Sequence, residues 1–153
     1  MAKIFPKSRG VIGFEGNGHD CTVRAAVNSS NFLTYEEVHA TLRKYGREHG
    51  KGAFFGSILK AYLELGFRYV GTHGTTNGAD YEVSVASSIL KQEIEAKRGM
   101  TLGRFIKENP VGRFVCLNRN HAFAVIDGKL IDTTALPAGT YISSVFKKVE
   151  VVV

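Results

Sequence analysis

Apolar side chains recur every three or four positions through the first two thirds of the chain, which is the period of a helix buried on one face. After Pro110 the period changes to two, which is typical of strands. The pattern predicts helices over 21–28, between Thr34 and Gly46, and over about 57–65, 81–98 and 102–107. It predicts strands over 113–117, 121–126 and 129–133, with one or two more in 140–144 and 146–153.

Several residues mark where these helices begin and end. Thr34 and Glu37 have the spacing of a capping box, in which each side chain bonds a backbone N–H of the first turn. Gly66 follows the third helix as a C′ residue, and Thr101 precedes the short helix as an N-cap. Between these helices we expect a short extended piece at 67–70 and then a polar, mobile loop over 71–80.

The strands are predicted to pair as an antiparallel sheet. Asp127-Gly128 lies between two apolar runs, and this dipeptide is typical of a two-residue type I′ turn. Helices that come first and an antiparallel sheet that follows indicate an α+β fold. The 153 residues fit a single domain spanning 1–153.

Composition narrows the class of protein. Hydrophobic residues make up 44% of the chain, enough for a core, yet no apolar run is long enough to cross a membrane. The first residues lack the apolar region of a signal peptide, so we expect none. The two cysteines show no metal-type spacing with histidine, so we expect no disulfide, metal or cofactor and a cytoplasmic location.

The formal net charge of +6 suits an acidic partner in principle. The basic residues are scattered, however, and aromatic residues do not alternate with them as they do in single-strand nucleic-acid binders. This pattern indicates a solvated surface and disfavours nucleic acid as a partner.

The stretch around Cys21 carries the first candidate chemistry. Asp20 is a good helix N-cap, which makes Cys21 the first residue of the helix. Unpaired N–H groups and the positive end of the helix dipole favour a thiolate there. Gly16 and Gly18 allow a substrate to approach the backbone closely.

Two polar residues in apolar strands complete a candidate triad. Across a two-residue turn, Phe123 lies opposite Asp132 and His121 opposite Thr134, so all four share one face of the hairpin. Asp132 would then hold the imidazole of His121, which would take the proton of Cys21. The competing interpretation is a hydrogen-bonded structural histidine at a strand end.

The remaining thiol and histidines are assigned other roles. Cys116 lies in the middle of an apolar strand and is predicted to be buried and inert. His39 and His49 are predicted on the surface, and His73 in the polar loop. His19 competes with His121 for the role of base, but it lies so close before the helix that it tends to point away from the thiol.

Three segments resemble papain-like cysteine peptidases: 18–26, 101–110 and 113–133. The likeness is nearest to the small bacteriocin-processing branch and to related short phage-encoded proteins. It implies a papain-like domain over 1–153, with a helical half before a C-terminal antiparallel sheet. It also implies a catalytic triad of Cys21, His121 and Asp132 acting on a peptide or protein substrate in the cytoplasm, that of the host if the protein is phage-encoded.

The resemblance predicts hydrolysis of a peptide or isopeptide bond through a thioester. The family places a glutamine upstream of the cysteine to stabilise the oxyanion; Glu15 or Asn17 stands in that region here. Asn17 and Asp20 are the expected oxyanion and substrate-binding residues, and the backbone N–H of Cys21 is the expected main-chain donor to the oxyanion. Two alternatives remain open: a transglutaminase-like acyl transferase or deamidase, and a catalytically silent phage protein that binds a host factor.

Overall fold

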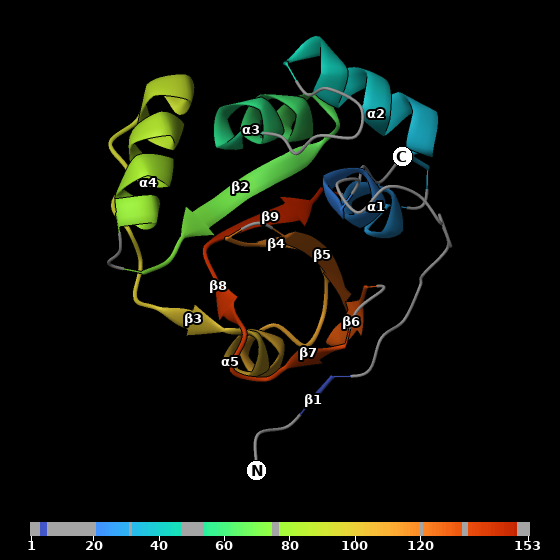
Figure 1. Ribbon diagram of the computed structural model, residues 1–153, viewed down its shortest axis with the longest axis vertical. Coiled ribbons are helices and arrows are strands. Elements are labelled where there is room, and N and C mark those ends of the chain that lie inside the picture. Colours follow the sequence, from blue (N-terminus) through green and yellow to red (C-terminus); the bar gives the residue numbers. More distant parts are fainter. Residues whose placement is uncertain are drawn as a thin grey trace.

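The computed structural model describes residues 4–5, 21–30, 32–46, 54–74, 77–119, 121–132 and 135–149. An antiparallel sheet in the order β2-β9-β4-β5-β6 forms its centre (Figure 1). The sheet strands are β2 (Phe67–Thr72), β4 (Arg113–Asn118), β5 (His121–Ile126), β6 (Lys129–Ile131) and β9 (Ser144–Lys148). Short pairs join β1 (Ile4–Phe5) to β7 (Leu136–Pro137) and β3 (Met100–Thr101) to β8 (Tyr141–Ile142). The helices of the described part are α1 (Cys21–Asn28), α2 (Tyr35–Lys44), α3 (Phe55–Glu64), α4 (Asn77–Leu90) and α5 (Leu102–Glu108).

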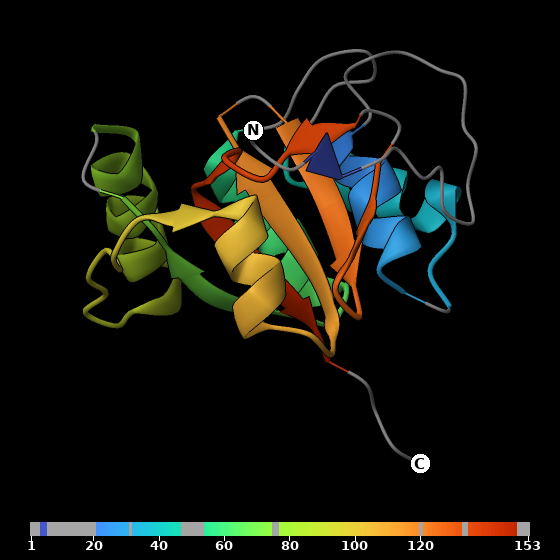
Figure 2. The same cartoon turned by 90° about the horizontal axis from the view of Figure 1, so that it is seen from below.

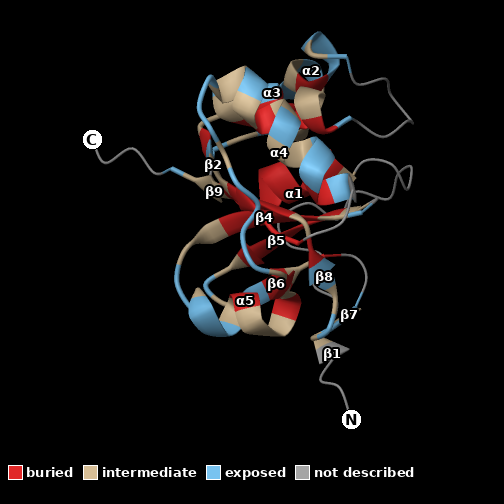
Figure 3. Ribbon diagram, turned by 90° about the vertical axis from the view of Figure 1, so that its left-hand side faces the viewer, coloured by how far each residue is buried: buried red, intermediate tan, exposed pale blue. Residues whose placement is uncertain are grey.

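Both faces of the sheet are covered. Helices α1 and α3 lie over one face, and α5 crosses the other, so that β4 and β5 run between them (Figure 2). Along β4, Val115 belongs to the core under the helices, whereas Phe114 and Cys116 belong to the core under α5. Burial on both sides explains why β4 and β5 are almost continuously apolar, and why the four central residues of each strand are buried (Figure 3).

The helix-end signals predicted at Thr34, Gly66 and Thr101 agree with the structure. The hydroxyl of Thr34 accepts the N–H of Glu37 at 3.2 Å, and that of Thr101 accepts the N–H of Arg104 at 3.4 Å. Gly66 has φ +91 immediately after the C-cap of α3, a conformation that glycine adopts without steric cost. Helix α3 begins at Phe55, two residues earlier than predicted.

The hairpin of β5 and β6 has the predicted two-residue turn. Ile126 pairs with Lys129, and Val125 with Leu130. Asp127 and Gly128 have φ +47 and +76, as a type I′ turn requires at both central positions. The register expected from the sequence is therefore confirmed up to the last pair of the ladder.

The predicted loop over 71–80 is wrong. Strand β2 continues to Thr72, and α4 already begins at Asn77. Thr72 and His73 of this segment are buried. The Thr72 hydroxyl lies 2.7 Å from that of Ser144 on the neighbouring strand β9. A buried hydroxyl with a partner is tolerated inside a sheet, and the polar composition of the segment concealed this.

Other boundaries also differ from the prediction. Helix α4 ends at Leu90 and not at residue 98, because Lys91 adopts a left-handed conformation with φ +55. The last strands break at Ser143, which separates β8 from β9. Because β2 belongs to the central sheet, the sheet is not confined to the C-terminal half as expected, although the fold is α+β.

Candidate active site

Cys21 is the first residue of α1, and its side chain is partly exposed. The helix packs against β5, which brings its first turn to the start of that strand. On the other side, the hydroxyl of Tyr62 on α3 donates a 2.6 Å hydrogen bond to the carbonyl of Thr22. The first turn of α1 is thus fixed between the sheet and a neighbouring helix, so the thiol has a defined position.

His121 begins β5, and Asp132 immediately follows β6. The ring Nε2 of His121 lies 2.7 Å from Oδ2 of Asp132. The side chain of His121 is 30% exposed and that of Asp132 only 5%. A carboxylate at this depth is costly without a partner, and His121 supplies one. The structure therefore brings together the two residues that the strand pattern placed on one face of the hairpin.

Cys21 and His121 are also in hydrogen-bond contact. Because Nε2 of the ring is turned to Asp132, Nδ1 is the nitrogen that remains for the thiol. The hydrogen bond to Asp132 and the one to Cys21 raise the pKa of His121 to about 9, against the opposing effect of burial. At neutral pH the ring is therefore the protonated partner.

The pKa of Cys21 is shifted in the opposite direction. Burial is the largest single effect and raises it, but the hydrogen bonds from His121 and from the backbone N–H of Ala122 lower it. The positive charges of His121 and Arg24 lower it further, and the pKa ends below its ordinary value. Both shifts favour a thiolate beside an imidazolium, which is the reactive form of a cysteine nucleophile.

A small hollow borders the thiol, with a volume of about 10 Å³, room for about one water molecule. Cys21, Arg24 and Asn28 line it from α1, and Asp132 lines it from the far side. Arg24 is only 9% exposed, although it is a charged residue. Sequence reasoning missed Arg24, but its charge within the apolar run 23–27 was a signal that could have identified it.

The described residues include one further thiol, Cys116, and two further histidines, His39 and His73, and these lie away from the cluster. Cys116 is fully buried on β4, and burial raises its pKa far above the ordinary value. His39 stacks on Tyr35 of the same helix, with ring centroids 5.8 Å apart. His73, expected in a loop, is buried, and its Nδ1 lies 2.7 Å from the carbonyl oxygen of Arg98.

Four candidates from the sequence lie outside the described residues: Asn17, Asp20, His19 and His49. The expected N-cap and the expected side-chain oxyanion donor are among them. Within the described residues, no group of three or more histidine, cysteine and acidic side chains is arranged to hold a metal ion. The longest helix there has 14 residues, and none has the length and apolar character needed to span a membrane.

Comparison with known proteins gives no match to a protein-family model, to a curated protein sequence or to a solved structure.

Proposed function

We propose that this chain is a cysteine hydrolase with a papain-like fold, which cleaves a peptide or isopeptide bond through a thioester. The observation that supports the proposal is the continuous contact from Cys21 to His121 and from His121 to Asp132. The thiol at a helix start, the histidine at the start of a strand and the aspartate after the next strand repeat the order on which the sequence resemblance rests. A reducing cytoplasm suits such a thiolate.

The first half of the reaction forms the acyl-enzyme. The thiolate of Cys21 attacks the carbonyl carbon, and the electron pair of the C=O bond moves to the oxygen. The intermediate collapses, the C–N bond breaks, and the imidazolium of His121 gives its proton to the leaving amine. The backbone N–H of Cys21 lies at the first position of α1, where the helix itself supplies no acceptor, and is suited to donate to the oxyanion.

The second half releases the product. Neutral His121 takes a proton from water, the hydroxide attacks the thioester carbon, and the C–S bond breaks to restore the thiolate. Asp132 keeps Nε2 of the ring occupied throughout, so Nδ1 stays directed at the reacting sulfur and water. An amine in place of water would give an acyl transfer from the same intermediate.

The test combines labelling and turnover. A peptide library would be incubated with the wild-type protein and with Cys21→Ala, and new termini would be identified by mass spectrometry. We expect cleavage that the variant lacks, and trapping of Cys21 by a peptide vinyl sulfone while Cys116 stays unmodified. Products that retain an added amine would identify a transferase. A Cys21 that reacts no faster than an unfolded cysteine would refute the proposal.

A further inference from the structure

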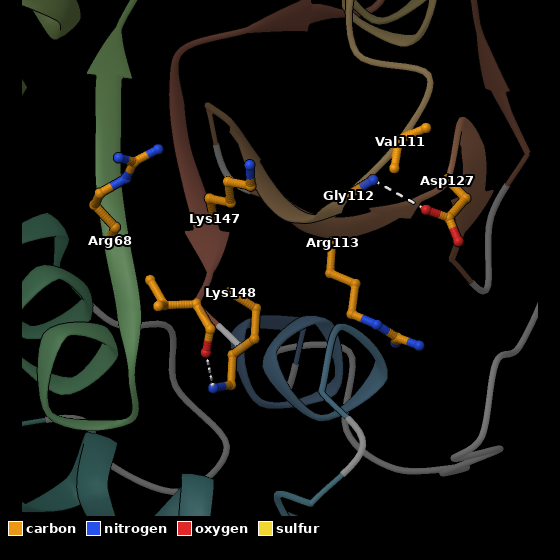
Figure 4. Close-up of a pocket in the computed structure, with 8 residues that line it drawn as sticks. Arg68, Val111, Gly112, Arg113, Asp127, Lys147 and Lys148 are labelled. Atoms are coloured by element: carbon orange, nitrogen blue, oxygen red, sulfur yellow. Dashed lines mark hydrogen bonds between the residues drawn. The ribbon is translucent and has the colours of Figure 1, made fainter. Parts of the chain in front are cut away.

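A second concave site lies at the far end of the sheet, where β2 and β4 begin and β9 ends. It is a groove of about 700 Å³, much larger than the hollow beside Cys21. Four basic side chains line it: Arg68 on β2, Arg113 on β4, and Lys147 and Lys148 on β9 (Figure 4). We call it the basic groove.

The strand register explains why these charges gather here. Arg68 lies directly opposite Lys147 in the ladder of β2 and β9, so the two side chains share one face. Lys148 lies opposite Phe67 and belongs to the other face. The basic groove therefore collects cations from both sides of the sheet at the end of the strands.

The two lysines are held by aromatic rings. The ammonium of Lys147 lies 5.6 Å from the ring centroid of Phe114, and that of Lys148 lies 5.7 Å from that of Phe67. Lys148 also donates to the carbonyl of Val149 at 3.1 Å. These contacts reduce the entropy lost when an anion binds, because the side chains are already placed.

One acidic residue, Asp127, also lines the basic groove. Its carboxylate accepts the N–H of Gly112 at 2.9 Å and so belongs to the turn between β5 and β6 (Figure 4). Even without Arg113, three cations, those of Arg68, Lys147 and Lys148, face one carboxylate that already has a partner. This excess of positive charge in the basic groove favours an anionic ligand with several negative groups.

We propose that the basic groove binds an acidic segment of the protein substrate. Guanidinium groups such as that of Arg68 match the two oxygens of a carboxylate. A nucleic acid strand would be expected to stack its bases on exposed rings, but the rings of Phe67 and Phe114 are covered by lysines. That this acidic segment belongs to a substrate rests on the proposed function, whereas the binding of an acidic peptide to the basic groove does not.

The position of the basic groove sets a distance along the substrate. From His121 to Asp127, the chain runs the length of β5, about 20 Å at roughly 3.3 Å per residue. An extended polypeptide covers the same distance with about six residues. The acidic segment should therefore lie at least about six residues from the cleaved bond.

The experiment measures binding without turnover. Fluorescence anisotropy would follow a labelled hexaglutamate peptide on the Cys21→Ala protein, with a hexaglutamine peptide for comparison. We expect hexaglutamate to bind and the Arg68→Gln/Lys147→Gln variant to bind it at least tenfold more weakly. The matched control, Arg43→Gln/Lys60→Gln, removes the same charge from exposed positions of α2 and α3 and should change binding less than twofold. Thermal unfolding would show that both variants fold.

Two outcomes would overturn the proposal. An equal loss of binding in both double variants would show that only the net charge attracts the peptide. Tighter binding of a single-stranded oligonucleotide than of hexaglutamate, lost in Arg68→Gln/Lys147→Gln, would assign the basic groove to nucleic acid. If the protein cleaves no peptide while hexaglutamate binds as expected, the proposed hydrolase function is refuted, but the proposed binding of an acidic ligand in the basic groove is supported.

Discussion

At the scale of single residues, the two thiols show how strongly position controls chemistry. Cys21 is partly exposed at a helix start, with His121 and the N–H of Ala122 beside it. Cys116 is surrounded by apolar side chains, and nothing there offsets the cost of a buried charge. The same side chain therefore has a lowered pKa at one position and is a small core residue at the other.

We predict that iodoacetamide at neutral pH alkylates Cys21 and leaves Cys116 unmodified in the folded protein. The reason is that only a thiolate reacts, and only Cys21 has a lowered pKa together with exposure. Peptide mapping by mass spectrometry measures both sites in one sample. Modification of Cys116 first would refute this assignment, and equal modification in urea serves as the unfolded reference.

We predict that His121→Ala moves the alkylation of Cys21 to higher pH. Without the imidazolium, burial is less strongly opposed, and the pKa of the thiol rises. The rate at pH 7 should then fall, and the midpoint of the rate–pH curve between pH 5 and 10 should rise. His39→Ala on α2 is the control and should leave the curve unchanged. An unchanged midpoint in His121→Ala would show that the imidazole does not lower the pKa of the Cys21 thiol.

Most residues that form the cluster could be predicted from the sequence, because an ionisable side chain in an apolar strand is itself a signal. His121 and Asp132 were identified in this way. Arg24 and the N–H of Ala122 were not. A backbone N–H is present whatever the residue type, so the sequence does not indicate which one will donate. Arg24 lies in the cluster because α1 packs against β5.

At the scale of elements, the hairpin of β5 and β6 decides which aspartate reaches the imidazole. Its two-residue turn puts Asp132 on the same face as His121, and an additional turn residue would place it on the other face. Asp127 lies at the opposite end of the same hairpin, where its carboxylate accepts a hydrogen bond from the backbone N–H of Gly112.

We predict that Asp132→Asn lowers the rate of turnover at least tenfold, whereas Asp127→Asn leaves it near the wild-type value. An amide at 132 lacks the carboxylate whose hydrogen bond, and to a smaller extent whose charge, raises the pKa of His121. Asparagine at 127 tolerates the positive φ of the turn. Steady-state kinetics give the rates and thermal unfolding confirms the fold. Equal activities in the two variants would reduce the site to Cys21 and His121.

The elements that the sequence predicted least well are those whose polar residues are buried by contacts made far along the chain. Thr72 was assigned to a loop because its neighbours are polar and rich in glycine. Its partner Ser144 lies on β9, and a pattern read within one segment contains no information on that pairing. The end of α4 was missed for a related reason, since Ile94 continues the apolar spacing beyond Lys91.

At the scale of the whole molecule, one sheet separates two cores. Phe146 of β9 lies at the centre of the core under the helices, where its ring contacts those of Phe55, Tyr62 and Tyr69. We expect this core to supply much of the stability that holds α1 over β5.

We predict that Phe146→Ala lowers the free energy of unfolding by about 3–5 kcal/mol, because it removes a fully buried ring and leaves a cavity in the core. Urea denaturation followed by circular dichroism measures the change. Phe54→Ala is the control: this side chain is 80% exposed, and its removal should cost less than about 0.5 kcal/mol. Similar losses in the two variants would contradict the placement of the core.

The order of the site along the chain has a consequence for biosynthesis. Cys21 is made about 100 residues before His121, which at roughly 5–20 residues per second corresponds to about 5–20 s on the ribosome. During that interval the thiol has neither its imidazolium nor the N–H of Ala122, so it behaves as an ordinary cysteine. Under the proposed function, the chain therefore acquires its reactive thiol only after the hairpin has been synthesised and has paired against α1.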